Sequence, residues 1–126
     1  MQHRNVKIAL ALLSLCLVSP LAFAGVQMGQ GTKTITTAGT PLALKSSSQL
    51  VTTLFVCGDS NNTGKVVVGA TPVATAGAQQ GIVLAAGSCA SIYTTNPNNA
   101  FDISLIKADV TVSGEEASYF WTYEFN

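Results

Sequence analysis

The chain has 126 residues, with six basic and six acidic side chains, one histidine and three cysteines. At this length one domain is expected. The balanced charge leaves no basic face of the kind that nucleic-acid binding requires, so no nucleic-acid partner is expected.

Residues 1–24 are predicted to be an export signal. Two basic residues precede an apolar run at residues 8–18, and Ala22-Phe23-Ala24 supplies the small-x-small pattern of a cleavage site. The run is shorter than the roughly 20 apolar residues that span a bilayer, so no stable membrane insertion is expected after cleavage. The sequence therefore predicts an exported protein, periplasmic or extracellular, with one domain at residues 25–126.

Two cysteines remain after the signal. Cys57 and Cys89 form an even pair in an oxidising compartment, which predicts a disulfide. Closing a loop of this length stabilises by roughly 3–4 kcal/mol in the chain-entropy description. Two buried free thiols are the alternative. Lipidation of Cys16 is a further alternative, but Leu15 stands where that cleavage favours a small residue.

The segment after the signal is predicted to be all-β. It is rich in Val, Ile, Thr and aromatic residues, and Gly, Asn and Ser interrupt it at short intervals. Strands are expected at residues 32–37, 40–45, 50–57, 65–69, 82–84, 88–93, 105–112 and 117–125. Seven or eight short antiparallel strands at this spacing predict a single β-sandwich or jelly-roll-like domain.

Two strands carry most of the pattern. Residues 50–57 are apolar on both faces, which predicts a central strand buried between layers. Residues 117–125 alternate, with one face formed by Tyr119, Trp121, Tyr123 and Phe125. Such a row could stack on sugar rings, but a core face is favoured. Phe120 lies on the opposite, polar face and is a candidate contact for a subunit or a ligand.

Two polar turns separate these strands. Residues 59–64 and residues 113–116 both carry turn residues suited to hairpins. The first also matches the start of a calcium loop, but its twelfth position is Ala70 instead of Glu, so a polar turn and no metal are predicted. Glu115 and Glu116 in the second turn are expected to be solvated charges.

No catalytic constellation is visible. The only histidine, His3, lies in the signal, and the acidic residues do not converge in the sequence. The sequence therefore predicts a protein that is not an enzyme and needs no cofactor.

Three segments together point to a family. Residues 50–69 (LVTTLFVCGDSNNTGKVVVG), 81–87 (GIVLAAG) and 105–123 (LIKADVTVSGEEASYFWTY) follow one another in an order that resembles small β-sandwich virion proteins of tailed and related phages. Capsid-surface and minor structural components belong to that group. The resemblance implies a sandwich fold and a structural role. The export signal and the disulfide depart from the family pattern.

The function expected from these observations is that of a non-enzymatic exported structural or interaction protein. It would be a virion-like or extracellular assembly subunit whose partners are copies of itself or other subunits. One alternative is a module that binds glycan or a cell surface through Phe120, or through the loops near Tyr93 and Asn98. A pilus-type subunit is a further alternative, indicated by the penultimate aromatic Phe125 and the single disulfide.

Overall fold

The computed structural model describes residues 25–70, 81–96 and 98–125. The predicted export signal lies outside these residues. The elements are β1 (Gly25–Ile35), β2 (Leu42–Ala43), β3 (Leu50–Val51), β4 (Thr53–Gly58), β5 (Val66–Gly69), β6 (Ile82–Leu84), β7 (Cys89–Tyr93), β8 (Phe101–Asp102), the 3-10 helix η1 (Ile103–Leu105), β9 (Lys107–Val110) and β10 (Glu115–Phe125). Every predicted strand has a counterpart. The prediction missed β8 and η1, and it began β1 seven residues too late.

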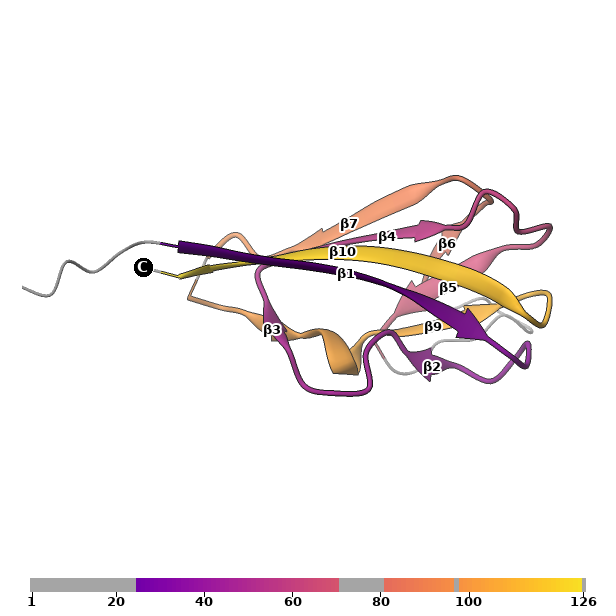
Figure 1. Cartoon of the computed structure of the whole chain (residues 1–126), viewed down its shortest axis with the longest axis horizontal. Helices are drawn as coiled ribbons and strands as arrows, with labels where there is room; N and C mark the ends of the chain where they lie inside the picture. The colour runs from indigo at the N-terminus through magenta and orange to yellow at the C-terminus, as the bar shows by residue number, and fades with distance from the viewer. Residues whose placement is uncertain (1–24, 71–80, 97, 126) are drawn as a thin grey trace, which may run out of the picture.

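Eight of the strands form two antiparallel sheets that pack face to face (Figure 1). The first sheet has the order β1-β10-β4-β7, the second has the order β2-β9-β5-β6, and β3 and β8 form a separate pair. The chain passes repeatedly from one sheet to the other. Of the eight strands, only β5 and β6 follow each other in the chain within one sheet, and this order of strands is that of a jelly roll. The predicted all-β sandwich of the jelly-roll kind is confirmed.

The core lies between the inner faces of the two sheets. From the first sheet, β4 contributes Leu54 and Val56, and β10 contributes Ala117 and Trp121. They meet the buried valines and alanine of β5 and β9, which are Val66, Val68, Ala108 and Val110. Trp121 is buried, and Tyr119 and Tyr123 pack against the core from the same face. Tyr119, Trp121 and Tyr123 of the predicted aromatic row therefore lie on a core face, as expected, and the side chain of Phe125 is outside what the structure describes.

The glycine- and glutamine-rich segment Gly25–Ile35 forms strand β1 although its residues have low β propensity. Aromatic rings of β10 pack against the backbone of its glycines. Gly29 and Gly31 lie directly opposite Trp121 and Tyr119 in the β1–β10 ladder. A Cβ at Gly29 would come within 2.4 Å of Trp121 Cζ2, and one at Gly31 within 2.5 Å of Tyr119 Oη. Only glycine permits this approach of ring to backbone. The low β propensity of the segment is thus offset by packing that the sequence of β1 does not reveal.

The two turns predicted as hairpins are instead connections between the sheets. Residues 59–64 lead from β4 in the first sheet to β5 in the second, and residues 113–116 lead from β9 in the second sheet to β10 in the first. No described residue other than glycine has a positive φ, so the asparagines of the first turn do not adopt the left-handed conformation that the hairpin required. The hairpin predictions were wrong because the same turn residues suit both a hairpin within one sheet and a connection between two sheets.

Contacts with the start of β10 fix the first turn. Glu115, expected to be solvated, is only 8% exposed. Its Oε1 accepts hydrogen bonds from Thr63 N at 2.6 Å, Gly64 N at 2.6 Å and Thr63 Oγ1 at 3.0 Å. Beside it, the Asn62 side chain donates to Glu116 O at 2.7 Å and accepts from Glu116 N at 3.1 Å. Glu115 is therefore a buried structural carboxylate, and that sequence prediction was wrong.

Candidate functional site

Large apolar side chains gather on the outer face of the first sheet, the face turned away from the second sheet. The ladder register places Phe120 of β10 opposite Phe55 of β4, and Tyr93 of β7 opposite Thr53 in the next row. Met28 and Val26 of β1 lie on the same face. All five are exposed; Tyr93 is 65%, Phe55 43% and Phe120 38% exposed. We refer to this surface as the outer face.

The outer face brings together two of the three residues predicted as surface contacts. Phe120 and Tyr93 both lie on it, exposed, on different strands. Asn98 is also exposed but belongs to the loop after β7, where its backbone N–H donates to Asn96 Oδ1 at 3.0 Å. The role of all three in binding stays a prediction.

Phe55 is the residue of this face that the sequence did not indicate. Residues 50–57 were expected to be buried on both faces, but β4 is buried only through Leu54, Val56 and Gly58 on its inner face. The Phe55 ring lies 6.3 Å from the Phe120 ring, tilted by 38°. The apolar sequence of β4 does not show which of its two faces the second sheet will cover. Its pairing with β10, which places Phe55 opposite Phe120, determines that Phe55 is exposed.

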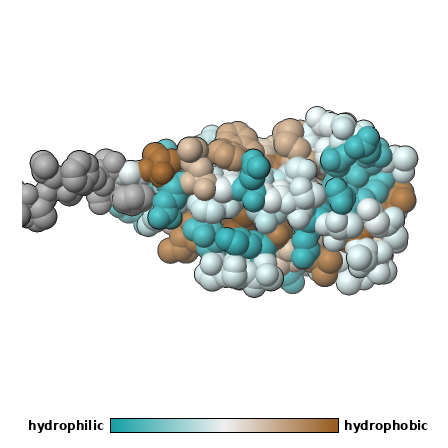
Figure 2. Space-filling model, in the orientation of Figure 1, coloured by the Kyte–Doolittle hydropathy of each residue, from teal (hydrophilic) through white to brown (hydrophobic). Residues whose placement is uncertain are grey.

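Two open hollows flank Phe55 on the outer face. The first, of about 350 Å³, is lined by Gln30, Gly31, Thr32, Phe55, Cys57, Ser118, Tyr119 and Phe120, and is called the Phe120 hollow. The second, of about 280 Å³, is lined by Thr52, Thr53, Phe55, Ser91, Tyr93, Thr94, Thr95 and Glu124, and is called the Tyr93 hollow. Aromatic rings and hydroxyl groups line both. On the face of the molecule drawn in Figure 2, separate brown areas lie among pale and teal residues.

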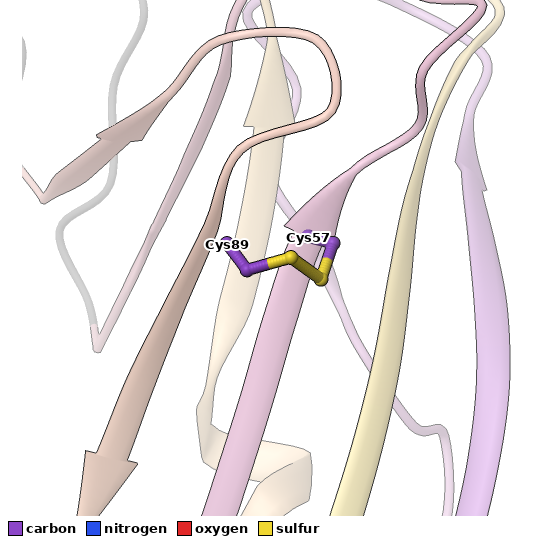
Figure 3. Close-up of a disulfide and its surroundings, with 2 residues drawn as sticks. All are labelled: Cys57 and Cys89. Atoms are coloured by element: carbon purple, nitrogen blue, oxygen red, sulfur yellow. A yellow bond between two sulfur atoms is a disulfide. The ribbon is translucent and has the colours of Figure 1, made fainter.

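The structure contains the predicted disulfide, and it lies on the outer face. Cys57 of β4 and Cys89 of β7 are directly opposite in the ladder, with a Cα–Cα distance of 4.0 Å. Figure 3 shows the bond in front of these two adjacent strands. It closes a loop with a sequence separation of 32 residues, which contains β5 and β6 of the other sheet. The disulfide joins two strands of the first sheet, but the chain segment between them also forms two strands of the second sheet.

One carboxyl group among the described residues has a strongly shifted pKa. Asp102 accepts hydrogen bonds from Ser48 Oγ and from the backbone N–H groups of Ser104 and Gln49, and these bonds hold the pKa of its carboxyl group well below its usual range. Among the described residues, no three His, Cys, Asp or Glu side chains lie close enough together to hold a metal ion. Among the described residues, Glu124 is the only charged one that lines either hollow.

No helix in the described ranges is long and apolar enough to span a membrane. No protein-family model matches the chain, and neither a curated protein nor a solved structure was found to be similar to it.

Proposed function

We propose that the protein is an exported, non-enzymatic assembly subunit whose copies join through the free edge of β1. One observation carries the proposal. β1 is eleven residues long and pairs with β10 over its whole length, while no strand of the described chain pairs with its other side. A long regular edge strand is a template for pairing with another chain.

The hydrogen bonds of β10 identify the groups that face this edge. Thr52 N donates to Thr122 O at 2.8 Å and Asp59 N donates to Glu116 O at 3.1 Å, so the even-numbered residues of β10 turn their backbone groups toward β4. The backbone N–H and C=O groups of successive residues in a strand point alternately to one neighbouring strand and to the other. The odd-numbered residues of β10 therefore form hydrogen bonds with β1, where their partners are also odd-numbered. The even-numbered residues of β1 therefore direct N–H and C=O groups to the open edge.

The partner that best fits this edge is a second copy of the chain. β1 contains no proline, its register with β10 shows no bulge, and Lys33 is its only charged residue. A two-fold antiparallel pair centred on Gln30 would place Lys33 opposite Gln27 of the second copy, so no like charges would meet. Closed two-fold contacts of this kind are the commonest among oligomers.

Two further observations support an exported, virion-like subunit. The Cys57–Cys89 bond suits an oxidising compartment, in agreement with the predicted signal. The jelly roll is used by viral capsid domains and by lectins, which supports an assembly role by analogy of fold alone. In the purified protein, a mass corresponding to a chain that begins at Gly25 and lacks two hydrogens would support export and the disulfide together.

A second candidate function is an extracellular module that binds glycan or a cell surface. It is favoured by the Tyr93 hollow, in which an exposed aromatic ring stands among hydroxyl side chains. The pilus-type alternative gains nothing comparable, because β1 and β10 close the first sheet by direct pairing.

The edge proposal is tested by Met28→Pro with Met28→Ala as its matched control. Met28 directs its backbone N–H to the open edge, so proline removes a donor that β10 does not use, and edge positions tolerate proline. Sedimentation should show wild type and Met28→Ala as oligomers and Met28→Pro as a folded monomer by circular dichroism. A monomeric wild type, or a Met28→Pro variant that still assembles, would refute the proposal. Mass spectrometry of particles or filaments from the source would then test virion association.

A further inference from the structure

We propose that the outer face binds a neutral oligosaccharide across two adjacent subsites that share the Phe55 ring. The subsites are the Phe120 hollow and the Tyr93 hollow. This inference rests on the second candidate function, and it is independent of assembly through the edge of β1.

The shape of the two hollows suits adjoining sugar rings. Their volumes are about 350 and 280 Å³, near the lower end of the range for small-molecule sites, which leaves room for a short stretch of sugar in each. Phe55 lines both hollows, so a ligand that fills one reaches the wall of the other. The arrangement therefore fits a linear chain of linked rings better than a single compact ligand.

The aromatic side chains supply surfaces for the apolar faces of sugar rings. Phe55, Phe120 and Tyr93 are all partly exposed on the outer face, and Tyr93 is the most exposed of the three. A sugar ring has C–H groups on its faces and hydroxyl groups on its rim, so it requires an aromatic ring with polar groups beside it. Both hollows offer that combination.

The polar side chains beside the rings have unused hydrogen-bonding capacity. In the Tyr93 hollow, Thr52 Oγ1 donates to Thr122 O and Thr94 Oγ1 donates to Asn96 O. Thr53, Ser91 and Thr95 also line it, and their side chains form no hydrogen bond within the described part of the chain. In the Phe120 hollow the same holds for Gln30, Thr32 and Ser118. Hydroxyl and amide groups both donate and accept, as sugar hydroxyls require.

Charge selects among sugars. No lysine or arginine of the described chain lines either hollow, and the single charged group that these residues contribute is the carboxylate of Glu124. An acidic sugar would bring a second negative charge with no cation to offset it, and like charges in close contact disfavour binding. The site should therefore accept neutral sugars and reject sialylated or sulfated ones.

The test is a titration of the full mature protein, followed by NMR, with cellotetraose, chitotetraose and the acidic sialyllactose. At least one neutral tetrasaccharide should shift the amide signals of Phe55, Ser91 and Tyr93, and sialyllactose should not. Phe55→Ala should weaken binding about tenfold or more, since both subsites lose their shared wall. Tyr93→Ala should weaken the binding of the tetrasaccharide more than the binding of the corresponding disaccharide.

The control is Val83→Ala, because Val83 is 42% exposed but belongs to β6 of the other sheet. It should bind like the wild type. If Phe55→Ala does not fold, Tyr93→Ala decides, because Tyr93 is largely exposed. Three results would overturn the proposal: no shift with either neutral sugar at millimolar concentration, equal binding of sialyllactose, or shifts confined to the second sheet. None of these results would alter the sedimentation of Met28→Pro. A failure of the sugar-binding proposal is therefore distinguishable from a failure of the proposed assembly through the edge of β1.

Discussion

Removing the Cys57–Cys89 disulfide should lower the free energy of unfolding by about 3–4 kcal/mol. The change is the double variant Cys57→Ala, Cys89→Ala. The bond joins residues separated by 32 positions. In the chain-entropy description a closed loop of that length restricts the unfolded chain by about 3–4 kcal/mol at 25 °C. The loop is not local, because the chain leaves the first sheet at β4, forms β5 and β6 of the second sheet, and returns at β7.

The folded state contributes little to this loss. Both cysteines face outward, with Cys89 exposed and Cys57 half-buried, so two alanines leave no enclosed cavity. The effect should therefore arise in the unfolded ensemble. For a domain of about 100 residues, each kcal/mol shifts the melting temperature by roughly 4–8 °C, so a loss of about 3–4 kcal/mol should lower the melting temperature of the double variant by roughly 12–32 °C.

Calorimetry and urea titration of oxidised wild type, reduced wild type and the double variant form the assay. The reduced protein and the double variant should agree, and both should show a larger m value, because an unfolded chain without the bond exposes more surface. A double variant that melts within about 5 °C of the oxidised protein would refute the reasoning. It would mean that the unfolded chain already keeps β4 close to β7.

Three other substitutions test particular contacts. Glu115→Gln should lower the free energy of unfolding in urea by about 1–3 kcal/mol, because its three hydrogen bonds lose their charge, and no change would contradict a structural role for the carboxylate. Gly29→Ala should cost about 1–3 kcal/mol and alter tryptophan fluorescence, since the new Cβ displaces the Trp121 ring; an unchanged midpoint would contradict this packing. The lowered pKa of Asp102, due first to the Ser48 hydroxyl, means that its carboxylate stabilises the fold above about pH 4 and that this stabilisation is lost as the pH falls further. Urea midpoints should therefore fall less between about pH 4 and pH 2 in Asp102→Asn than in wild type, and equal falls would contradict it.

The strands were predictable wherever burial alternates along the chain. In β10 the period of two places Trp121 inside and Phe120 outside, and the structure has both in those positions. In residues 105–112 the same alternation predicts one shared face for Ile106, Ala108, Val110 and Val112. The first three are buried, whereas Val112, beyond the end of β9, is 44% exposed, so the prediction was wrong for Val112. It also placed Asp109 on the polar face, but Asp109 is fully buried and accepts a hydrogen bond from Gly39 N at 2.9 Å. Local alternation cannot reveal a partner 70 residues away.

The sheet to which each strand belongs was not predictable from local sequence. Residues 59–64 have the composition of a hairpin, yet they connect two sheets, because Glu115 and Asn62 bind the turn to the start of β10 across more than 50 residues of sequence. Turn residues determine the local backbone conformation, whereas long-range hydrogen bonds determine which sheet the next strand joins. The exposure of Phe55, and with it the shared wall of the two hollows, depends on the same choice.

The geometry of the β1 edge determines how two copies would present their outer faces. Within the described ranges, only even-numbered residues of β1 have backbone groups directed away from β10, so every hydrogen-bonded pair across the edge must join an even residue to an even residue. Residues directly opposite each other point to the same face of a sheet, and the even-numbered side chains of β1 point to the outer face. The two outer faces would therefore lie on the same side of one continuous eight-stranded sheet. If each face holds an oligosaccharide, the pair would bind a surface bearing many such chains more tightly than either copy alone, without any new contact to the sugar.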